Sequence, residues 1–276
     1  MEALLEVRRP GVLETAFSRH RAFTGWALFY GGLGAMTLMF GLLDLRTLDG
    51  VPVWSKPTKF NLSLVFYFLT LAWLAPLLGA EYFRSPFGRL LTALPIFAAA
   101  LEMSYIIFQA ARGEPSHFNV STTFHAVAYS IMGFGAAVMV GVCAFMGARI
   151  LWIHRARLTP YVFGAGFGLL LTCLLGGGFG SYLGSQAGHA VAVEMSDATR
   201  LPLTGWVQNG GDLRVAHFFG MHAMQLVPLA GWLLGICVSS RQRGLLLTAV
   251  VALVYSAVAL VTFLQALTAE PFPGFL

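Results

Sequence analysis

Long apolar stretches separated by short polar segments make up nearly the whole chain. Each of seven stretches has about the 20 residues that a helix needs to cross a hydrocarbon core about 30 Å thick. The expected spans are Thr24–Leu43, Phe60–Ala80, Leu90–Ala110, Phe124–Ala148, Pro160–Leu183, Val215–Ser239 and Gly244–Leu267. The pattern predicts an all-α integral membrane protein, a bundle of seven transmembrane helices.

The segments outside these spans are too short for a soluble domain. We expect residues 1–23 to be a cytoplasmic amphipathic segment, 24–268 the transmembrane domain and 269–276 a short outer tail. Leu4, Leu5, Val7, Val12, Leu13 and Phe17 suggest a short helix on the membrane surface, which Pro10-Gly11 would break. Three acidic and four basic residues interrupt this segment, so we do not expect a cleavable signal peptide.

Composition and charge agree with a membrane protein. Charged residues are only 11% of the chain, against about 25% in soluble domains. The 17 Lys and Arg residues divide unequally between the two sides, eleven with the N-terminus and six opposite. The positive-inside rule then predicts a cytoplasmic N-terminus and an outer C-terminus. The same rule explains the net charge of +5, so we expect no nucleic-acid partner.

The fifth span carries small residues at every fourth position. They are Gly164, Gly168, Thr172, Gly176, Gly180, Gly184 and Gly188. Such a ridge lets helices approach closely in lipid; the alternative is a surface for a flat ligand such as a porphyrin, chlorin or quinone ring. Cys143, Cys173 and Cys237 all lie within spans without CxxC spacing, so they indicate neither disulfides nor a thiolate metal site.

Polar side chains interrupt two spans near their predicted outer ends. Glu102 shares a face of the third span with Tyr105 and Gln109. An ionisable residue within a span is a functional candidate by default, although a hydrogen-bonded structural carboxyl is the simpler reading. The sixth span carries His217, His222 and Gln225 on one broad arc, too wide for both histidines to chelate one ion as an i,i+4 pair.

Two further histidines are expected at the same depth: His125 begins the fourth span, and His117 precedes it in the outer loop. A b-type haem would take two imidazoles, from His125 with His217 or His222. A zinc site would take three ligands from His117, His217 and His222, with Glu102 as acid or base. Taken singly, each histidine is more simply a structural hydrogen-bonding group.

The outer edge is also rich in cations. Lys56, Lys59, Arg112 and Arg214 lie there with the polar Gln109. They suit either anchoring in lipid head groups or a cationic rim that admits an anionic or polar head group.

Three strings in this chain resemble a family of uncharacterised bacterial multi-spanning membrane proteins. They are KPTKFNLSLVFYFLTLAWL (Lys56–Leu74), QAARGEPSHFNVST (Gln109–Thr122) and LPLTGWVQNGGDLRVAHFFGMHAMQLVPL (Leu201–Leu229). The resemblance reaches from the second span to the sixth and implies a compact multi-pass fold, but no activity. The matching positions are Lys56, Lys59, Gln109, Arg112, His117, Asn119, Asp212, Arg214, His217, His222 and Gln225.

These observations lead to one leading hypothesis and one rival. The first is a bacterial inner-membrane protein with an outer-leaflet site that binds a metal, haem or a lipid-like substrate, with redox or hydrolytic chemistry. Its catalytic candidates are Glu102, His217 and His222, and its cofactor candidates are His117, His125, His217, His222 and Gln225. The rival is a non-catalytic subunit of a respiratory or photosynthetic complex that contacts pigment or lipid. Partners are then membrane lipids, other subunits or further copies of the chain; a transporter is less favoured, since Glu102 is the only clear intramembrane acid.

Overall fold

The computed structural model describes residues 12–79, 81–202 and 204–272. Within these ranges seven helical spans are long and apolar enough to cross a membrane. They are α2 (Arg21–Leu43), α3 (Ser55–Leu74) continued by η1 (Ala75–Leu78), α4 (Pro86–Arg112), α5 (Thr123–His154) continued by η3 (Arg155–Arg157), α6 (Pro160–Leu171) with η4 (Thr172–Gly177) and α7 (Gly178–Ser185), α8 (Leu213–Cys237) and α9 (Arg241–Leu267). The chain is a multi-pass membrane protein.

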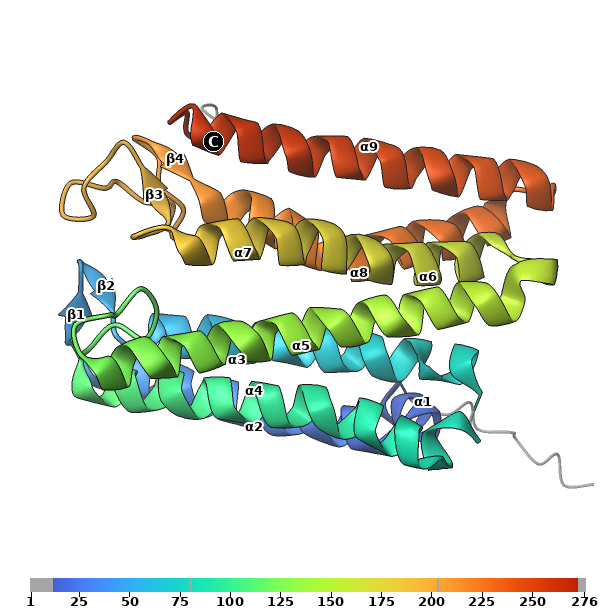
Figure 1. Ribbon diagram of the computed structural model, residues 1–276, viewed down its shortest axis with the longest axis horizontal. Coiled ribbons are helices and arrows are strands. Elements are labelled where there is room, and N and C mark those ends of the chain that lie inside the picture. The colour runs from blue at the N-terminus through green and yellow to red at the C-terminus, as the bar shows by residue number, and fades with distance from the viewer. Residues whose placement is uncertain (1–11, 80, 203, 273–276) are drawn as a thin grey trace, which may run out of the picture.

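The spans alternate in direction, and their connections gather at two ends (Figure 1). One end, which we call the loop end, carries residues 44–54, 113–122 and 186–212. It holds two small antiparallel sheets, β1 (Thr47–Leu48) with β2 (Val51–Pro52) and β3 (Ala190–Val191) with β4 (Gly211–Asp212). The opposite end carries α1 (Val12–Arg19), η2 (Tyr82–Arg84) and the short turns before α6 and α9.

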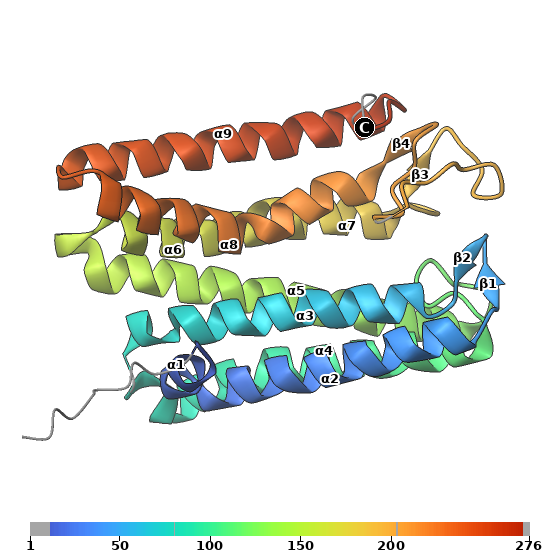
Figure 2. The ribbon, with the colours of Figure 1, turned by 180° about the vertical axis from the view of Figure 1, so that it is seen from behind.

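The helices pack mainly against their neighbours in the chain. α2 lies on α3, α4 on α5, α5 on α6, and α8 on both α6 and α9. Figures 1 and 2 show α9 and α2 on opposite flanks of the bundle. α5 lies between a group formed by α6 to α9 and a group formed by α2 to α4. The site candidates on α3 and α4 therefore meet those on α8 only near the middle of the bundle.

Helix starts follow ordinary capping chemistry. Side-chain oxygens of Ser85, Thr122, Thr159, Asp212 and Ser240 each accept a backbone N–H of the first turn that follows. Such a cap satisfies one of the donors that a helix start leaves free. Most helices start a few residues before the predicted apolar spans. The spans were predicted from apolar residues alone, so they left out the polar first turn of each helix.

The fifth span differs most from expectation, because it is not one regular α-helix. A π-helical segment, η4, interrupts it between α6 and α7. Its glycine ridge lies against α8: a Cβ added to Gly164 would lie 2.6 Å from the Val227 carbonyl oxygen, and one on Gly168 would lie 2.7 Å from that of Ala223. Over these positions the ridge serves close helix packing.

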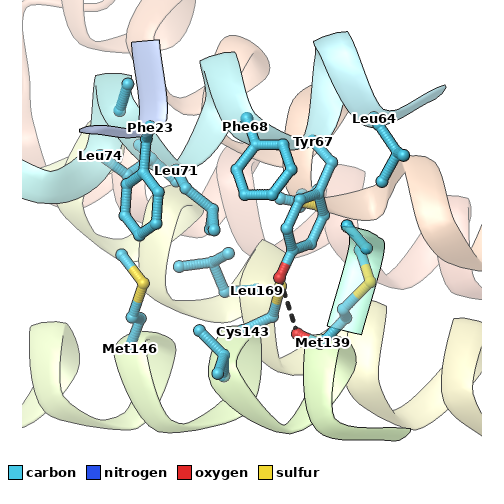
Figure 3. Close-up of a cluster of buried hydrophobic side chains, with 14 of the residues drawn as sticks. Phe23, Leu64, Tyr67, Phe68, Leu71, Leu74, Met139, Cys143, Met146 and Leu169 are labelled. Carbon is cyan, nitrogen blue, oxygen red and sulfur yellow. Dashed lines mark hydrogen bonds between the residues drawn. The ribbon is translucent and has the colours of Figure 1, made fainter. Parts of the chain in front are cut away.

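An apolar core extends along the bundle from Phe23 near the opposite end to Ile106 near the loop end, and Figure 3 shows part of it. Phe23 and Phe68 are fully buried there with Leu71 and Met146. Its one labelled polar tip, the Tyr67 hydroxyl, donates to the Met139 carbonyl oxygen at 2.9 Å.

The amphipathic N-terminal helix was expected partly in residues that lie outside the described ranges. Within them, α1 begins at Val12, directly after Pro10-Gly11, and buries Ala16 while Phe17 stays exposed. At the other terminus α9 ends at Leu267, where the seventh span was predicted to end.

Candidate functional site

Glu102 and His117 come together at the loop end of the bundle. Glu102 projects from α4, and His117 lies in the loop that joins α4 to α5. The His117 Nε2 atom is 3.8 Å from Glu102 Oε1, and the two side chains are 21% and 13% exposed. An acid and an imidazole therefore lie together near the loop end of the transmembrane bundle, as the sequence suggested.

The environment of His117 favours a neutral imidazole. Burial lowers the pKa of His117 well below its ordinary value, and the positive charge of Lys56 lowers it further. The ring packs edge-on against Phe60 of α3, with centroids 5.4 Å apart. A neutral imidazole has one nitrogen lone pair, so His117 can accept a hydrogen bond or a proton.

Three cations approach the same region from two helices. We call Lys56 and Lys59 of α3 and Arg214 of α8 the cation cluster. Lys56 lies within electrostatic reach of Glu102 and Arg214, and Lys59 within reach of Arg214. Arg214 is paired with the buried carboxylate of Asp212 at 2.6 Å. In the described part of the chain neither lysine has an ion pair within contact distance, so the cluster carries surplus positive charge.

The cluster also ties down the long loop before α8. Lys59 Nζ donates to the Thr204 carbonyl oxygen at 2.9 Å, and Arg214 donates to that of Gly205 at 2.6 Å. Asp212 accepts from the Val207 backbone N–H at 2.9 Å. These contacts hold residues 204–207 over the cations, so this part of the loop is anchored.

His217 is oriented by the π-helical segment. Its Nδ1 atom is 2.9 Å from the carbonyl oxygen of Gly176 in η4. Only an N–H can donate to a carbonyl, so the proton is on Nδ1 and the Nε2 lone pair remains for other contacts. His217 lies within electrostatic reach of both His117 and His222. The ring of His222 packs on Phe218, with centroids 4.2 Å apart.

Gln225 links α8 to α3 one turn deeper. Its amide nitrogen donates to the Thr70 hydroxyl at 3.1 Å, while its amide oxygen has no partner among the described residues. The sequence identified Gln225 but not Thr70, because threonine is common in apolar spans and its distant partner leaves no local signal.

The remaining predicted residues form a separate group that shapes the loop 113–122. Gln109 donates to the Pro115 carbonyl oxygen at 3.0 Å, and Arg112 pairs with Glu114 at 2.7 Å. His125 Nδ1 lies 2.8 Å from the Tyr105 hydroxyl, and its Nε2 lies 3.5 Å from Glu114. These contacts give Gln109, Arg112 and His125 structural partners, and their substrate and cofactor roles stay predictions.

The geometry bears on the two predicted cofactors. Across the described residues no three His, Cys, Asp or Glu side chains are grouped as metal ligands, so the set His117, His217 and His222 is not assembled as a zinc site. Both ring nitrogens of His125 already face partners. To ligate haem iron, His125 would have to give up one of these contacts. The zinc ligand set is therefore not grouped among the described residues, and the haem ligand pair stays a prediction.

Two fully buried polar side chains, Tyr30 and Asn61, escaped the sequence analysis. Tyr30 of α2 lies within electrostatic reach of Glu102, and Asn61 lies on α3 beyond Phe60. Asn61 was visible as a polar residue within an apolar span, whereas Tyr30 is indistinguishable from the many aromatic residues that contact lipid.

Comparison with known proteins gives no match: no family model, no curated protein and no solved structure is similar to this chain.

Proposed function

We propose that this chain is a bacterial inner-membrane protein that binds the anionic head group of a membrane-soluble ligand at its loop end. The loop end faces out of the cytoplasm in this proposal, as the distribution of Lys and Arg favours. The observation that carries the proposal is the cation cluster, in which Lys56 and Lys59 each lie within electrostatic reach of Arg214 and the cluster has one close carboxylate pair.

Electrostatics explains why an anion suits this position. Like charges that are only partly hydrated repel more strongly than in bulk water, because the local dielectric constant is lower. A phosphate or carboxylate between α3 and α8 would offset this repulsion and give the lysines partners, since charge-assisted hydrogen bonds are among the stronger polar contacts. Glu102 offsets part of the charge of Lys56, and Asp212 pairs with Arg214, so Lys59 is the cation of the cluster for which no acidic neighbour is described.

The neighbouring imidazoles suit acid–base chemistry on such a head group. Burial and Lys56 favour the neutral form of His117, which lies 3.8 Å from Glu102, and His217 keeps a free Nε2 lone pair. Glu102, His217 and His222 remain the proposed catalytic candidates, with His117 added as a hydrogen-bond acceptor. A hydrolytic reaction fits this set better than metal chemistry, because the required ligand group is not assembled.

Binding of defined probes tests the proposal. The protein in neutral-lipid nanodiscs would be titrated with short-chain phosphatidic acid, with inorganic phosphate and with the matched uncharged diacylglycerol. We expect phosphatidic acid to raise the melting temperature and the diacylglycerol to leave it unchanged. A response to phosphate alone would identify a soluble anion as ligand, while equal responses to both lipids would contradict a charge-selective site.

Variants assign any binding to the cluster. Lys56→Gln should weaken phosphatidic acid binding by about tenfold, the equivalent of one charge-assisted contact of about 1.4 kcal/mol. Arg243→Gln, an exposed residue at the opposite end, is the matched control and should bind as the parent does. Unchanged affinity in Lys56→Gln would place the anion elsewhere.

A visible spectrum of the gently purified protein, before and after dithionite, tests the cofactor alternatives. A Soret band that sharpens on reduction would establish haem. A chlorin or carotenoid spectrum would support the pigment-binding subunit instead. Protein absorbance alone, as we expect, would leave zinc to elemental analysis.

A further inference from the structure

A groove lies between α2 and α4 on the surface of the bundle, at the opposite end from the candidate site. The two helices lie side by side, but α2 packs mainly against α3 (Figures 1 and 2). The groove has a volume of about 650 Å³, within the range of about 300–1,000 Å³ that is usual for small-ligand sites. It shares no lining residue with the site at the loop end.

One face of α4 gives the groove its length. The residues that α4 contributes are Arg89, Thr92, Ala93, Ile96, Phe97 and Ala100. Residues three and four apart share a face of a helix. From the first to the last this face extends about 16 Å at 1.5 Å per residue. That is about half of a hydrocarbon core about 30 Å thick, so the groove is as long as one leaflet is deep.

The polar residues of the groove gather at the end where α2 and α4 begin. Beyond Thr92 the α4 residues of the groove are apolar, and Trp26 of α2 lines it with them. Arg89 lies in the first turn of α4 and is exposed. Arg84 is paired with Glu81, whereas Arg89 forms no ion pair within the residues that the structure describes. The groove therefore has apolar walls and a cationic mouth.

His20 presents a hydrogen-bond donor at the same mouth. Its Nδ1 accepts from the Phe23 backbone N–H at 3.2 Å, and burial lowers its pKa to about 4, so the ring is neutral and its proton is on Nε2. Nε2 faces the Thr92 hydroxyl oxygen at 3.5 Å, which is longer than an ordinary hydrogen bond. The ring is held by Phe23 and Phe83, with centroids 4.1 and 4.5 Å away. The Nε2–H is thus fixed in place and can donate to a closer acceptor.

We propose that this groove binds one anionic phospholipid, with an acyl chain along α4, an ester carbonyl oxygen at His20 and the phosphate at Arg89. The order of groups in such a lipid matches the order of residues along the groove, because its ester acceptors lie between the charged head and the apolar tail. Arginine suits the head, since its guanidinium binds phosphate oxygens through paired hydrogen bonds. This site is in the other leaflet from the proposed head-group site and does not depend on it.

Charge favours a lipid over a second copy of the chain as the occupant. The described acids at this end are Glu14 and Glu81, and Glu81 already pairs with Arg84. A second copy therefore brings mainly further arginines to Arg89, whereas a phospholipid brings a phosphate.

Native mass spectrometry tests for the bound lipid. The detergent-solubilised protein, with Lys56→Gln to weaken the loop-end site, would be titrated with dioleoyl phosphatidylglycerol. A second titration would use dioleoyl phosphatidylcholine, which has the same tails and no net charge. We expect one phosphatidylglycerol per chain to bind about fivefold more tightly than phosphatidylcholine. Equal affinity would overturn the proposal, and a dimer held without lipid would assign the groove to a second copy instead.

Two pairs of variants locate that lipid. Arg89→Gln should weaken phosphatidylglycerol binding by about fivefold, whereas Arg243→Gln, at an exposed arginine of α9 at the same end, should bind as the parent does. Ala93→Phe fills the groove and should remove the tight binding, and Ala257→Phe, at an exposed position of α9, is its control. Both alanines are exposed, so we expect these variants to fold, which the melting temperature checks. Parent-like binding by Arg89→Gln or by Ala93→Phe would place the lipid elsewhere.

Crosslinking of the parent protein gives an independent test. A phosphatidylglycerol with a diazirine in the middle of one tail would be photolysed on the protein, and the labelled peptides would be identified by mass spectrometry. Labelling should concentrate on Trp26, Ile96, Phe97 and Ala100, and excess dioleoyl phosphatidylglycerol should suppress it there. Labelling spread evenly over the lipid-facing helices would show ordinary contact with surrounding lipid and contradict a defined site.

Discussion

His217 Nδ1 donates a hydrogen bond to the carbonyl oxygen of Gly176, 2.9 Å away in the π-helical segment η4. π-helical segments are rare and often lie at functional sites. The contact fixes which nitrogen carries the proton, and it aligns His217 with the middle of the bundle. It joins the most irregular stretch of backbone to a candidate catalytic side chain.

We expect His217 to be the Nδ1–H tautomer in the folded protein. Two-bond proton–nitrogen correlations of the histidine rings, assigned by the signal lost in His217→Gln, report the tautomer directly. Substitution gives a second readout. His217→Asn, whose amide nitrogen reaches a place near Nδ1, should retain about 1 kcal/mol more stability than His217→Leu. An Nε2–H signal from this ring would disprove the contact.

The contact between α8 and η4 leaves no room for a side chain at Gly220. A Cβ there would lie 2.5 Å from the backbone nitrogen of Gly176. We expect Gly220→Ala to cost about 1–3 kcal/mol through backbone shifts and to lower the melting temperature. Gly235→Ala in the same helix meets nothing within 4 Å, so it should be neutral or stabilising, because alanine is the better helix former. Equal effects of the two variants would argue against tight packing at Gly220.

Much of the fold follows from hydropathy and spacing alone. Seven apolar runs predicted the seven spans. A single apolar run can cross lipid as a helix, because a helix satisfies its backbone hydrogen bonds within the same segment. The four-residue repeat from Gly164 to Gly180 predicted close packing, which the contacts with α8 confirm. The π-helical segment was not predicted, because a single extra residue in a turn has no signature in an otherwise apolar sequence.

The candidate site was only partly accessible to sequence. The position of Glu102 near the loop end of α4 and of His117 in the loop that follows α4 predicted that the two would lie at a similar level. Rotation about the helix axis was not accessible, and it decides which groups meet. For that reason His125 faces Tyr105 rather than His217, and the three histidines of the proposed zinc set are not grouped.

Asp212 makes stability at acid pH depend on one carboxylate. Its side chain is fully buried; burial acts to raise its pKa, but His189 and Arg214 outweigh this and hold the pKa below its usual range. A lowered folded-state pKa stabilises the fold above the unfolded value of about 3.9, and this contribution is lost as pH falls through the folded value. Melting temperature should therefore fall steeply below about pH 4.

Substitution tests this dependence. Asp212→Asn should cost about 3 kcal/mol at neutral pH, since it leaves Arg214 without its partner, and should flatten the acid limb. Asp49→Asn, at an exposed turn position, is the matched control. It should leave unchanged both the stability at neutral pH and the fall in melting temperature at acid pH. A parent-like acid limb in Asp212→Asn would assign the pH dependence to other groups.

The two lysines of the cation cluster should have separable roles. Lys59 donates to the Thr204 carbonyl oxygen, whereas Lys56 forms no hydrogen bond to the loop in the described structure and lies beside Glu102. Lys59→Met should therefore speed amide hydrogen exchange across residues 204–208 by a few-fold, as expected for one exposed hydrogen bond of about 0.5–1 kcal/mol. Lys56→Met should leave that exchange unchanged and weaken anion binding. If Lys56→Met loosened the loop as much as Lys59→Met, anion binding and loop anchoring would be one property of the cluster rather than two.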